Sequence, residues 1–165
     1  MSNRSRSRLF TFALAIVLAA MLAGPASGMV DESKRGPNAV QPKPTKAERV
    51  VDIALDAVGT PYRWGGESPA SGFDCSGLVR WAYGRVGVAL PHNSCALYGQ
   101  GKRVPESGMR PGDILFFEGL GHVGLYLGRG RMVHAPQTGR HVEVVRLART
   151  NYGARLIGAR RVIAA

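Results

Sequence analysis

The stretch "SGFDCSGLVRWAY" (residues 71–83) leads from a loop into the first turn of an amphipathic helix. Asp74 is a good helix N-cap, and apolar residues recur at helical spacing behind it until Gly87. The stretch therefore predicts a helix whose apolar face packs on the core and whose first position is a cysteine. The residues of that face are Cys75, Leu78, Val79, Ala82 and Val86.

A further helix is predicted on each side of this one. Upstream, Thr45 and Glu48 form a capping box, and apolar residues follow at helical spacing up to Gly59. Residues 60–73, between the two helices, have the composition of a turn-rich loop. Downstream, a short helix is expected over residues 94–99. The first part of the domain is therefore predicted to be helical.

Beyond Val104 the pattern changes to short β-rich runs separated by Gly, Pro and Asn. Helices followed by strands, with short connections between them, are typical of an α+β domain. We therefore expect N-terminal helices packed on a five- to six-stranded antiparallel sheet. The expected strands lie within residues 112–117, 121–128, 131–135, 141–147 and 155–163.

The first 28 residues have the pattern of a secretory signal peptide. Arginines at positions 4, 6 and 8 precede an uncharged apolar run over residues 9–23, and small residues follow it. The run is shorter than the roughly 20 residues that a membrane-spanning helix needs, so a retained signal anchor is the weaker alternative. We expect a signal peptide at 1–28, a flexible linker at 29–44, one folded domain at 45–165, and export to the periplasm, the cell wall or the exterior.

The chain is strongly basic. Its 165 residues carry 22 Lys and Arg against 11 Asp and Glu, a formal net charge of +11, and removal of the three arginines near the N-terminus would leave +8. An exported basic protein suits anionic partners such as cell-wall polymers or an acidic membrane surface, and no nucleic-acid partner is expected. A solvated basic face without a dedicated partner is the alternative. A monomer is the default expectation.

Cys75 has two competing interpretations. In an exported protein, a chain with two cysteines first suggests a disulfide, here between Cys75 and Cys95. At a helix N-terminus, however, unpaired N–H groups and the helix dipole stabilise a thiolate, so Cys75 is expected to ionise more easily than an ordinary thiol, although Asp74 opposes this. A nucleophilic cysteine would need a base from elsewhere in the chain.

Two histidines are related by the predicted strands. If residues 121–128 and 131–135 form a hairpin, Gly124 pairs with His134, and His122 becomes a diagonal neighbour of His134 on the same face. One imidazole would then orient the other, which is what a cysteine and its base require.

Two other interpretations of these side chains stay open. Both histidines would also be compatible with half-buried strand positions that have no chemical role. A zinc site is the second alternative, but the sequence contains neither a CxxC nor an HExxH spacing to support it. Its ligands would be Cys75, Cys95, His122 and His134.

Five stretches occur in one order along residues 45–163, and together they resemble the NlpC/P60 family of papain-like cysteine peptidases. The resemblance implies a papain-like α+β domain, an exported peptidoglycan endopeptidase with no cofactor or metal, and cleavage of the bond between D-γ-glutamate and the diamino acid of the stem peptide. An amidase or acyltransferase with the same triad, and a non-catalytic wall-binding protein, are the alternatives. The stretches are "GTPYRWGGESPASGFDCSGLV" (59–79), Leu90, Pro91 and Ser94, "RPGDILFF" (110–117), "GHVGLYLGRGRMVHAP" (121–136) and "LIGARRV" (156–162).

The resemblance also implies a role for individual residues. Cys75 matches the nucleophile, His122 the general base, and His134 the polar residue that orients the base. Tyr62 matches a tyrosine that helps to form the oxyanion hole together with the Cys75 backbone N–H. The residues that match positions shaping the stem-peptide pocket are Asp74 and Ser76.

The sequence departs from the family pattern in one loop. After Leu90 and Pro91 the family usually carries Arg followed by Thr or Ser, whereas here His92 and Asn93 follow. Because this loop lies near the substrate cleft in the family, the peptide preference of this chain stays open.

Overall fold

The computed structural model describes residues 43–163 of the chain. The expected signal peptide (1–28) and most of the expected linker (29–44) lie outside the described residues. Within the described part, every helix is too short or too polar to cross a membrane.

Side-chain caps start the three helices that the sequence predicts. The Thr45 hydroxyl accepts from the Glu48 backbone N–H, and the Glu48 carboxylate accepts from the Thr45 N–H at 2.8 Å, which confirms the capping box. Asp74 and Asn93 cap the next two helices in the same way. The helices are α1 (Lys46–Asp56), α2 (Cys75–Gly84), α3 (Ser94–Tyr98) and a fourth that the sequence did not indicate, α4 (Asn151–Ala154), with 3₁₀ turns η2 (Glu106–Gly108), η3 (Glu118–Leu120) and η4 (Leu147–Arg149).

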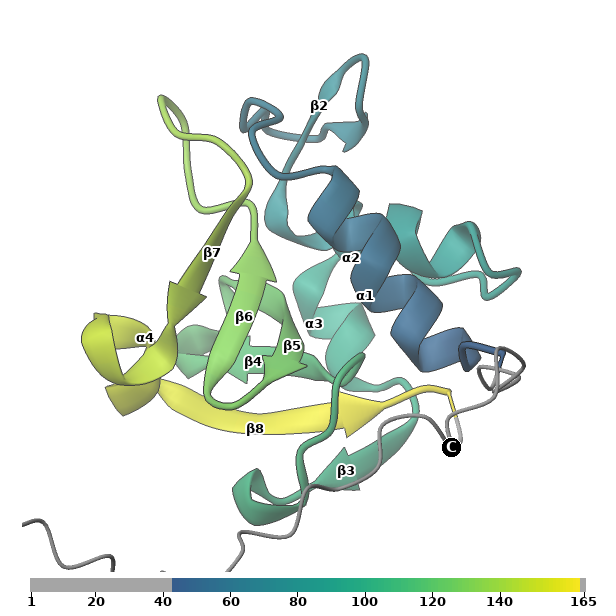
Figure 1. Cartoon of the computed structure of the whole chain (residues 1–165). Coiled ribbons are helices and arrows are strands. Elements are labelled where there is room, and N and C mark those ends of the chain that lie inside the picture. The colour runs from purple at the N-terminus through teal and green to yellow at the C-terminus, as the bar shows by residue number, and fades with distance from the viewer. Residues whose placement is uncertain (1–42, 164–165) are drawn as a thin grey trace, which may run out of the picture. The chain divides into compact units, whose positions relative to one another are not determined.

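The strands form a six-stranded antiparallel sheet with the order β3-β8-β4-β5-β6-β7 (Figure 1). Each of the five predicted runs contains one strand, so the α+β prediction is confirmed. The sixth strand was missed because it has only three residues and precedes the run of predicted strands. The strands are β3 (Lys102–Val104), β4 (Ile114–Phe117), β5 (Val123–Gly128), β6 (Arg131–His134), β7 (Glu143–Arg146) and β8 (Leu156–Arg161).

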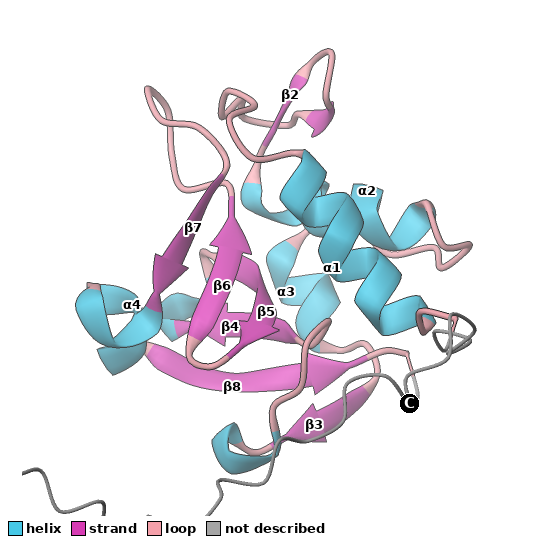
Figure 2. Ribbon diagram, viewed as in Figure 1, coloured by secondary structure: helices cyan, strands magenta, loops and turns pink. Residues whose placement is uncertain are grey.

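The loop expected over residues 60–73 contains a small hairpin of its own. Strands β1 (Glu67–Ser68) and β2 (Gly72–Phe73) pair antiparallel, just before α2 begins (Figure 2). The Tyr62 backbone N–H donates to the Arg140 carbonyl at 2.8 Å, which ties this loop to the connection between β6 and β7. This hydrogen bond therefore fixes the loop before α2 against the connection between β6 and β7.

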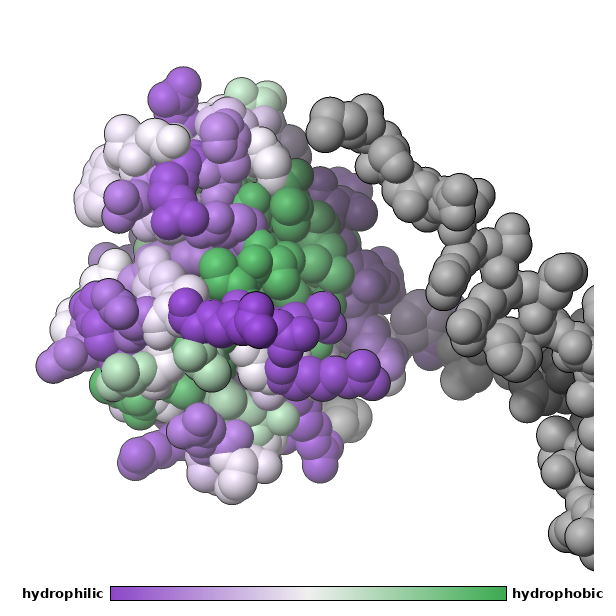
Figure 3. All heavy atoms as spheres, turned by 60° about the vertical axis from the view of Figure 1, so that its left-hand side comes forward, coloured by the Kyte–Doolittle hydropathy of each residue, from purple (hydrophilic) through white to green (hydrophobic). Residues whose placement is uncertain are grey.

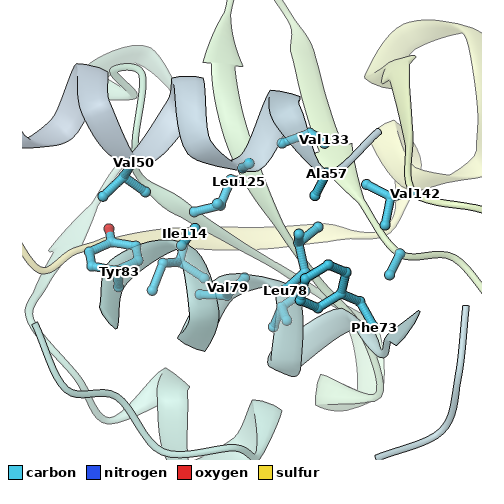
Figure 4. Packing of buried hydrophobic residues seen from close by; sticks show 14 of the residues in the cluster. Val50, Ala57, Phe73, Leu78, Val79, Tyr83, Ile114, Leu125, Val133 and Val142 are labelled. Atoms are coloured by element: carbon cyan, nitrogen blue, oxygen red, sulfur yellow. The ribbon is translucent and has the colours of Figure 1, made fainter. Parts of the chain in front are cut away.

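The main core lies between the helices and one face of the sheet (Figure 4). Side chains of α1 and α2 meet those of β4, β5 and β6 there, and burial of their apolar surface is the main force that holds the two layers together. A smaller cluster covers the opposite face of the sheet, and Tyr152 of α4 packs against it. Fully buried members of the main core include Val50, Leu78, Val79, Ile114, Leu125 and Val133.

Candidate active site

Cys75 occupies the first position of α2, as the sequence predicts. The Asp74 carboxylate accepts from the Gly77 N–H at 2.7 Å and from the Ser76 hydroxyl at 3.0 Å, which fixes the first turn of the helix. Leu78, in the next turn, is fully buried in the core. Packing in the core thus fixes α2, while Cys75 at its N-terminus remains partly accessible to solvent.

The thiol does not ionise more easily than usual, contrary to the prediction from its helix position. Burial raises the pKa of Cys75, and the nearby negative charge of Asp74 raises it further. The backbone N–H groups of Val123, Ser76 and Cys75 itself act in the opposite direction, but they do not outweigh burial. The sequence could not weigh these effects, because the degree of burial of this thiol depends on the tertiary packing of Cys75 against the core.

The two histidines lie together as the predicted hairpin requires. Leu125 pairs with Val133 across β5 and β6, and this register sets Gly124 opposite His134. A side chain at residue 124 would lie only 3.3 Å from the His134 Cβ, so glycine leaves the space that the histidine occupies. His122 Nε2 and His134 Nδ1 are 2.8 Å apart and share a hydrogen bond.

Both imidazoles are neutral at neutral pH. Burial lowers the pKa of His122 to about 4, and the positive charge of Arg155 contributes. Burial lowers the pKa of His134 to about 3, with further contributions from His122 and Arg140. Since the Cys75 pKa is raised, the cysteine and its neighbouring histidine rest as an uncharged thiol and an uncharged imidazole.

Tyr152 of α4 packs against both imidazoles. Its ring stacks on His122 with the centroids 5.1 Å apart and 24° between the planes, and its edge faces His134 at 4.9 Å. No sequence pattern indicated this contact, because Tyr152 belongs to a single-turn helix and lies 30 residues after His122. The aromatic ring restricts the orientations open to the histidine pair.

Tyr62 lies on the loop before α2 and lines the same cleft as Cys75. The hydrogen bond from its backbone N–H ties this loop to Arg140. Its side chain is 8% exposed. Burial raises the pKa of Tyr62, and the negative charges of Asp74 and of Cys75 in its thiolate form add to this effect. The phenol therefore keeps its proton at neutral pH and remains a hydrogen-bond donor.

Most of the predicted site residues line one cleft of about 300 Å³. His134 does not line the cleft; it is fully buried behind His122. An exposed Trp64, with 89% of its surface accessible, stands at the cleft and was not singled out from the sequence. The lining residues are Tyr62, Trp64, Gly65, Asp74, Cys75, Ser76, His92, Asn93, Ser94, Gly121, His122 and Pro136.

His92, in the loop that departs from the family pattern, contacts the helix cap. Its Nε2 lies 2.9 Å from both carboxylate oxygens of Asp74, and its Nδ1 lies 3.3 Å from Glu67. Glu67 in turn forms an ion pair with Arg80 on α2. A chain of polar contacts therefore joins this loop to the N-terminus of α2 next to Cys75.

The structure also bears on the two alternatives for the cysteines. Cys75 and Cys95 are both free thiols, and Cys95 is exposed on α3. Within residues 43–163, no group of three or more His, Cys, Asp or Glu side chains is arranged to hold a metal ion. In the described part of the chain, the two thiols are therefore unlinked and the four side chains of the zinc alternative are not gathered into one group.

Comparisons with known proteins show the family and the fold of the chain. The model of the NlpC/P60 family matches residues 59–161. A solved NlpC/P60 family protein from Bacillus cereus superimposes with a TM-score of 0.69 at 32% identity, over 74% of this chain and 42% of that one.

Three curated relatives carry enzymatic names. A probable endopeptidase of Mycobacterium tuberculosis is 46% identical over 127 residues, which is 74% of this chain and 33% of the relative. The murein DD-endopeptidase MepH of Escherichia coli is 36% identical over 72% of this chain and 48% of its own length. The gamma-D-glutamyl-L-lysine dipeptidyl-peptidase of Bacillus subtilis is 40% identical over 70% and 40%, respectively. The chain thus spans between a third and a half of these relatives.

Proposed function

Because the chain belongs to the NlpC/P60 family, we propose that it is an exported cysteine endopeptidase that hydrolyses the stem peptides of peptidoglycan. One observation carries the proposal. Cys75, at the start of α2, opens onto the same cleft as His122, and the Nε2 of His122 is hydrogen-bonded to His134. A nucleophile, a base and a residue that orients the base are the three parts that acyl transfer by a cysteine needs.

The first step joins attack and proton transfer. His122 uses its Nε2 for the hydrogen bond to His134, so Nδ1 is the nitrogen left to accept the thiol proton. The Cys75 sulfur forms a bond to the amide carbonyl carbon while its proton moves to His122. Because the resting pair is uncharged, this transfer occurs in the presence of substrate instead of preceding it.

The tetrahedral intermediate carries its negative charge on the former carbonyl oxygen. Tyr62 keeps its phenolic proton and lies on the loop above the helix start, so it can donate to this oxygen together with the Cys75 backbone N–H. His122 then gives the proton to the leaving amine and the C–N bond breaks. Water, with its proton taken by His122, releases the acyl group from the sulfur and restores the thiol.

For the substrate, we propose the bond between D-γ-glutamate and the diamino acid. The Bacillus subtilis relative is named for a γ-D-glutamyl-L-lysine peptide, whereas MepH is named for a DD bond, so relatives differ in the bond that they cut. Asp74 and Ser76 line the cleft beside Cys75 and are the residues that we expect to contact the stem peptide. The positive charge of the chain favours association with anionic envelope polymers.

The test is incubation of the purified protein with isolated peptidoglycan, followed by identification of the released fragments by mass spectrometry. The Cys75→Ala variant is the control. Fragments that end in D-glutamate and appear only with the native cysteine support the proposal. Cleavage at a DD bond or at the glycan–peptide link would replace the proposed bond, a transferred acyl group would indicate an acyltransferase, and binding without fragments would indicate a non-catalytic wall-binding protein.

A further inference from the structure

One nitrogen of the buried histidine has no hydrogen-bond partner. His134 is fully buried, and its Nδ1 is bonded to His122. Among residues 43–163, its Nε2 makes no hydrogen bond. A buried polar atom left without a partner costs free energy, so the groups that surround this nitrogen need to be identified.

Glu143 is the group next to this nitrogen. It is the direct cross-strand partner of His134 in the pairing of β6 with β7. Its Oε1 lies 3.5 Å from His134 Nε2, slightly beyond an ordinary hydrogen bond. Arg140 holds the carboxylate, with contacts of 2.7 Å to both oxygens. A small rotation of the Glu143 side chain would therefore bring a held carboxylate oxygen into hydrogen-bond distance of the imidazole.

The direction of the hydrogen bonds depends on this carboxylate. A carboxylate only accepts, so it favours the form of His134 that carries its proton on Nε2. That form leaves His134 Nδ1 bare, and His122 must then donate to it from Nε2. His122 Nδ1 is consequently bare as well, which is the form that can accept the thiol proton of Cys75. The opposite tautomer of His134 would leave His122 with its proton on Nδ1, the nitrogen that the proposed mechanism needs free to accept the thiol proton.

The charges around the pair give Glu143 a second effect. Besides burial, Arg155 lowers the pKa of His122 and Arg140 lowers that of His134. Neither Tyr152 nor the Cys75 thiol carries a charge at neutral pH to offset them. Of the described carboxylates, Glu143 is the one that lies within ion-pair distance of either imidazole. The imidazolium that forms on His122 during attack is therefore stabilised through His134 by this carboxylate.

On this basis, and resting on the proposed function, we propose that Glu143 is a positioning residue: it fixes the tautomer of His134 and stabilises the charge that develops on His122. Glu143 takes no proton in the reaction. Two protons move, and His122 carries both: the Cys75 thiol proton goes to the leaving amine, and a proton of the attacking water goes back to the sulfur. Glu143 acts through His134 and does not touch the substrate.

The first experiment measures the tautomer directly, without any substrate. Ring-nitrogen chemical shifts of the full-length protein are recorded by NMR for the wild type, Glu143→Gln and Glu143→Leu. We expect His134 to carry its proton on Nε2 in the wild type and in Glu143→Gln, because an amide oxygen also accepts. In Glu143→Leu the acceptor is gone, and a mixture of tautomers is expected. A single Nε2–H form in Glu143→Leu would overturn the proposal.

The second experiment separates the charge from a merely structural role. Glu143→Gln is expected to lower kcat on peptidoglycan about tenfold with KM unchanged, because a hydrogen bond to a neutral acceptor is weaker than one to a charged acceptor. It also removes a negative charge that stabilises the imidazolium, so the acid limb of the rate profile moves to lower pH. The matched control Arg140→Gln removes a positive charge, and its acid limb moves to higher pH.

Opposite shifts of the two variants support the proposal, because a structural role in the loop would lower activity in both variants without moving the limbs apart. Shifts in the same direction, or a kcat within about twofold of the wild type in Glu143→Leu, would overturn it. Thermal unfolding of each variant shows whether it is folded. If no variant, the wild type included, cuts peptidoglycan, the proposed function fails while the tautomer measurement still tests Glu143.

Discussion

At the scale of single residues, the site is held in an uncharged resting state by burial. The thiol pKa of Cys75 is raised and the imidazole pKa of His122 is lowered, so each group is shifted away from its ionised form. An ion pair at rest would require burial to be offset by contacts that these residues do not have. In the proposed reaction, the charge on this pair therefore develops as the substrate is attacked.

The two cysteines offer an internal comparison of this resting state. Cys75 is partly buried and its thiol pKa is raised, whereas Cys95 is exposed. Alkylation at neutral pH is expected to modify Cys95 first, and the rate at Cys75 should increase as the pH rises above the ordinary thiol range of about 8.5. Peptide mass spectrometry of the alkylated protein distinguishes the two sites. Faster modification of Cys75 at neutral pH would contradict the uncharged resting pair.

The Tyr62 hydroxyl provides a test of oxyanion stabilisation. Tyr62→Phe keeps the buried ring and removes the donor, so kcat should fall by about 10² to 10³ while KM changes little. The thermal unfolding midpoint of the variant serves as the control for packing. A kcat equal to that of the wild type would mean that Tyr62 has only a packing role.

The proximity of His122 and His134 could be predicted from the sequence, but the residues that surround the pair could not. A hairpin register follows from strand period and turn position, and the predicted pairing of Gly124 with His134 is the register found. Glu143 and Tyr152 reach the same pair from other parts of the chain. Their proximity depends on how β7 and α4 fold back, and no local pattern carries that information.

At the scale of secondary-structure elements, the first turn of α2 packs directly against the preceding loop. Gly77 lies so close to Gly66 that a side chain at residue 77 would meet the Gly66 carbonyl. The Asp74 N–H donates to the same carbonyl at 2.9 Å, and the Gly65 N–H donates to the Asp74 carboxylate. Cys75 belongs to the first turn of α2, and Tyr62 belongs to the loop before it. The contact between these two segments therefore sets the position of Cys75 relative to Tyr62.

Two glycines of α2 give a matched pair for testing this packing. Gly77→Ala is expected to destabilise the protein by about 3 kcal/mol or more, because backbone atoms must move to admit the methyl group. Gly84→Ala, at the other end of the helix, meets no atom within 4 Å and should be neutral or stabilising by up to about 1 kcal/mol. Denaturant unfolding measures both. Equal free energies for the two variants would contradict the close contact.

Elements with strong local signals were predicted well, and short ones were not. Thr45, Asp74 and Asn93 each cap the helix that was expected to follow them. Strand β3 and helix α4 have three and four residues, which is too short for a period to appear. Both exist because neighbouring elements hold them: β3 pairs with β8, and α4 packs on the sheet through Tyr152.

At the scale of the whole molecule, most charged side chains of the described residues lie on the surface, and few are buried. The described residues include 17 Lys and Arg and 9 Asp and Glu. Hydrophilic residues cover much of the face in Figure 3 and surround a smaller hydrophobic area. Among the few buried polar side chains, Asp113 is paired with Arg161 at 2.7 Å. His122 and His134 differ from this ion pair because they are buried as neutral imidazoles. Their burial makes the free energy of unfolding depend on pH.

This dependence can be measured in the whole protein. The folded-state pKa values of His122 and His134, about 4 and about 3, lie below the unfolded value of about 6.5. The unfolded chain therefore binds more protons between these values, and the free energy of unfolding falls as the pH is lowered from about 6.5. Each imidazole contributes up to about 1.4 kcal/mol per pH unit.

Denaturant unfolding at a series of pH values measures this slope. In the control variant His134→Asn, one of the two groups is absent, so the slope between pH of about 4 and about 6.5 should become shallower. An unchanged slope in this variant would show that His134 is not buried in its neutral form.

The place of β8 in the sheet has a consequence for biosynthesis. Although it is the last strand in the sequence, it lies inside the sheet, between β3 and β4, and pairs with both. When the chain emerges N-terminus first, β4, β5, β6 and β7 can form their hairpins, but the edge of β4 stays open until residues 156–161 have emerged. A chain truncated before these residues would therefore carry an unpaired strand edge, a substrate for chaperones and proteases.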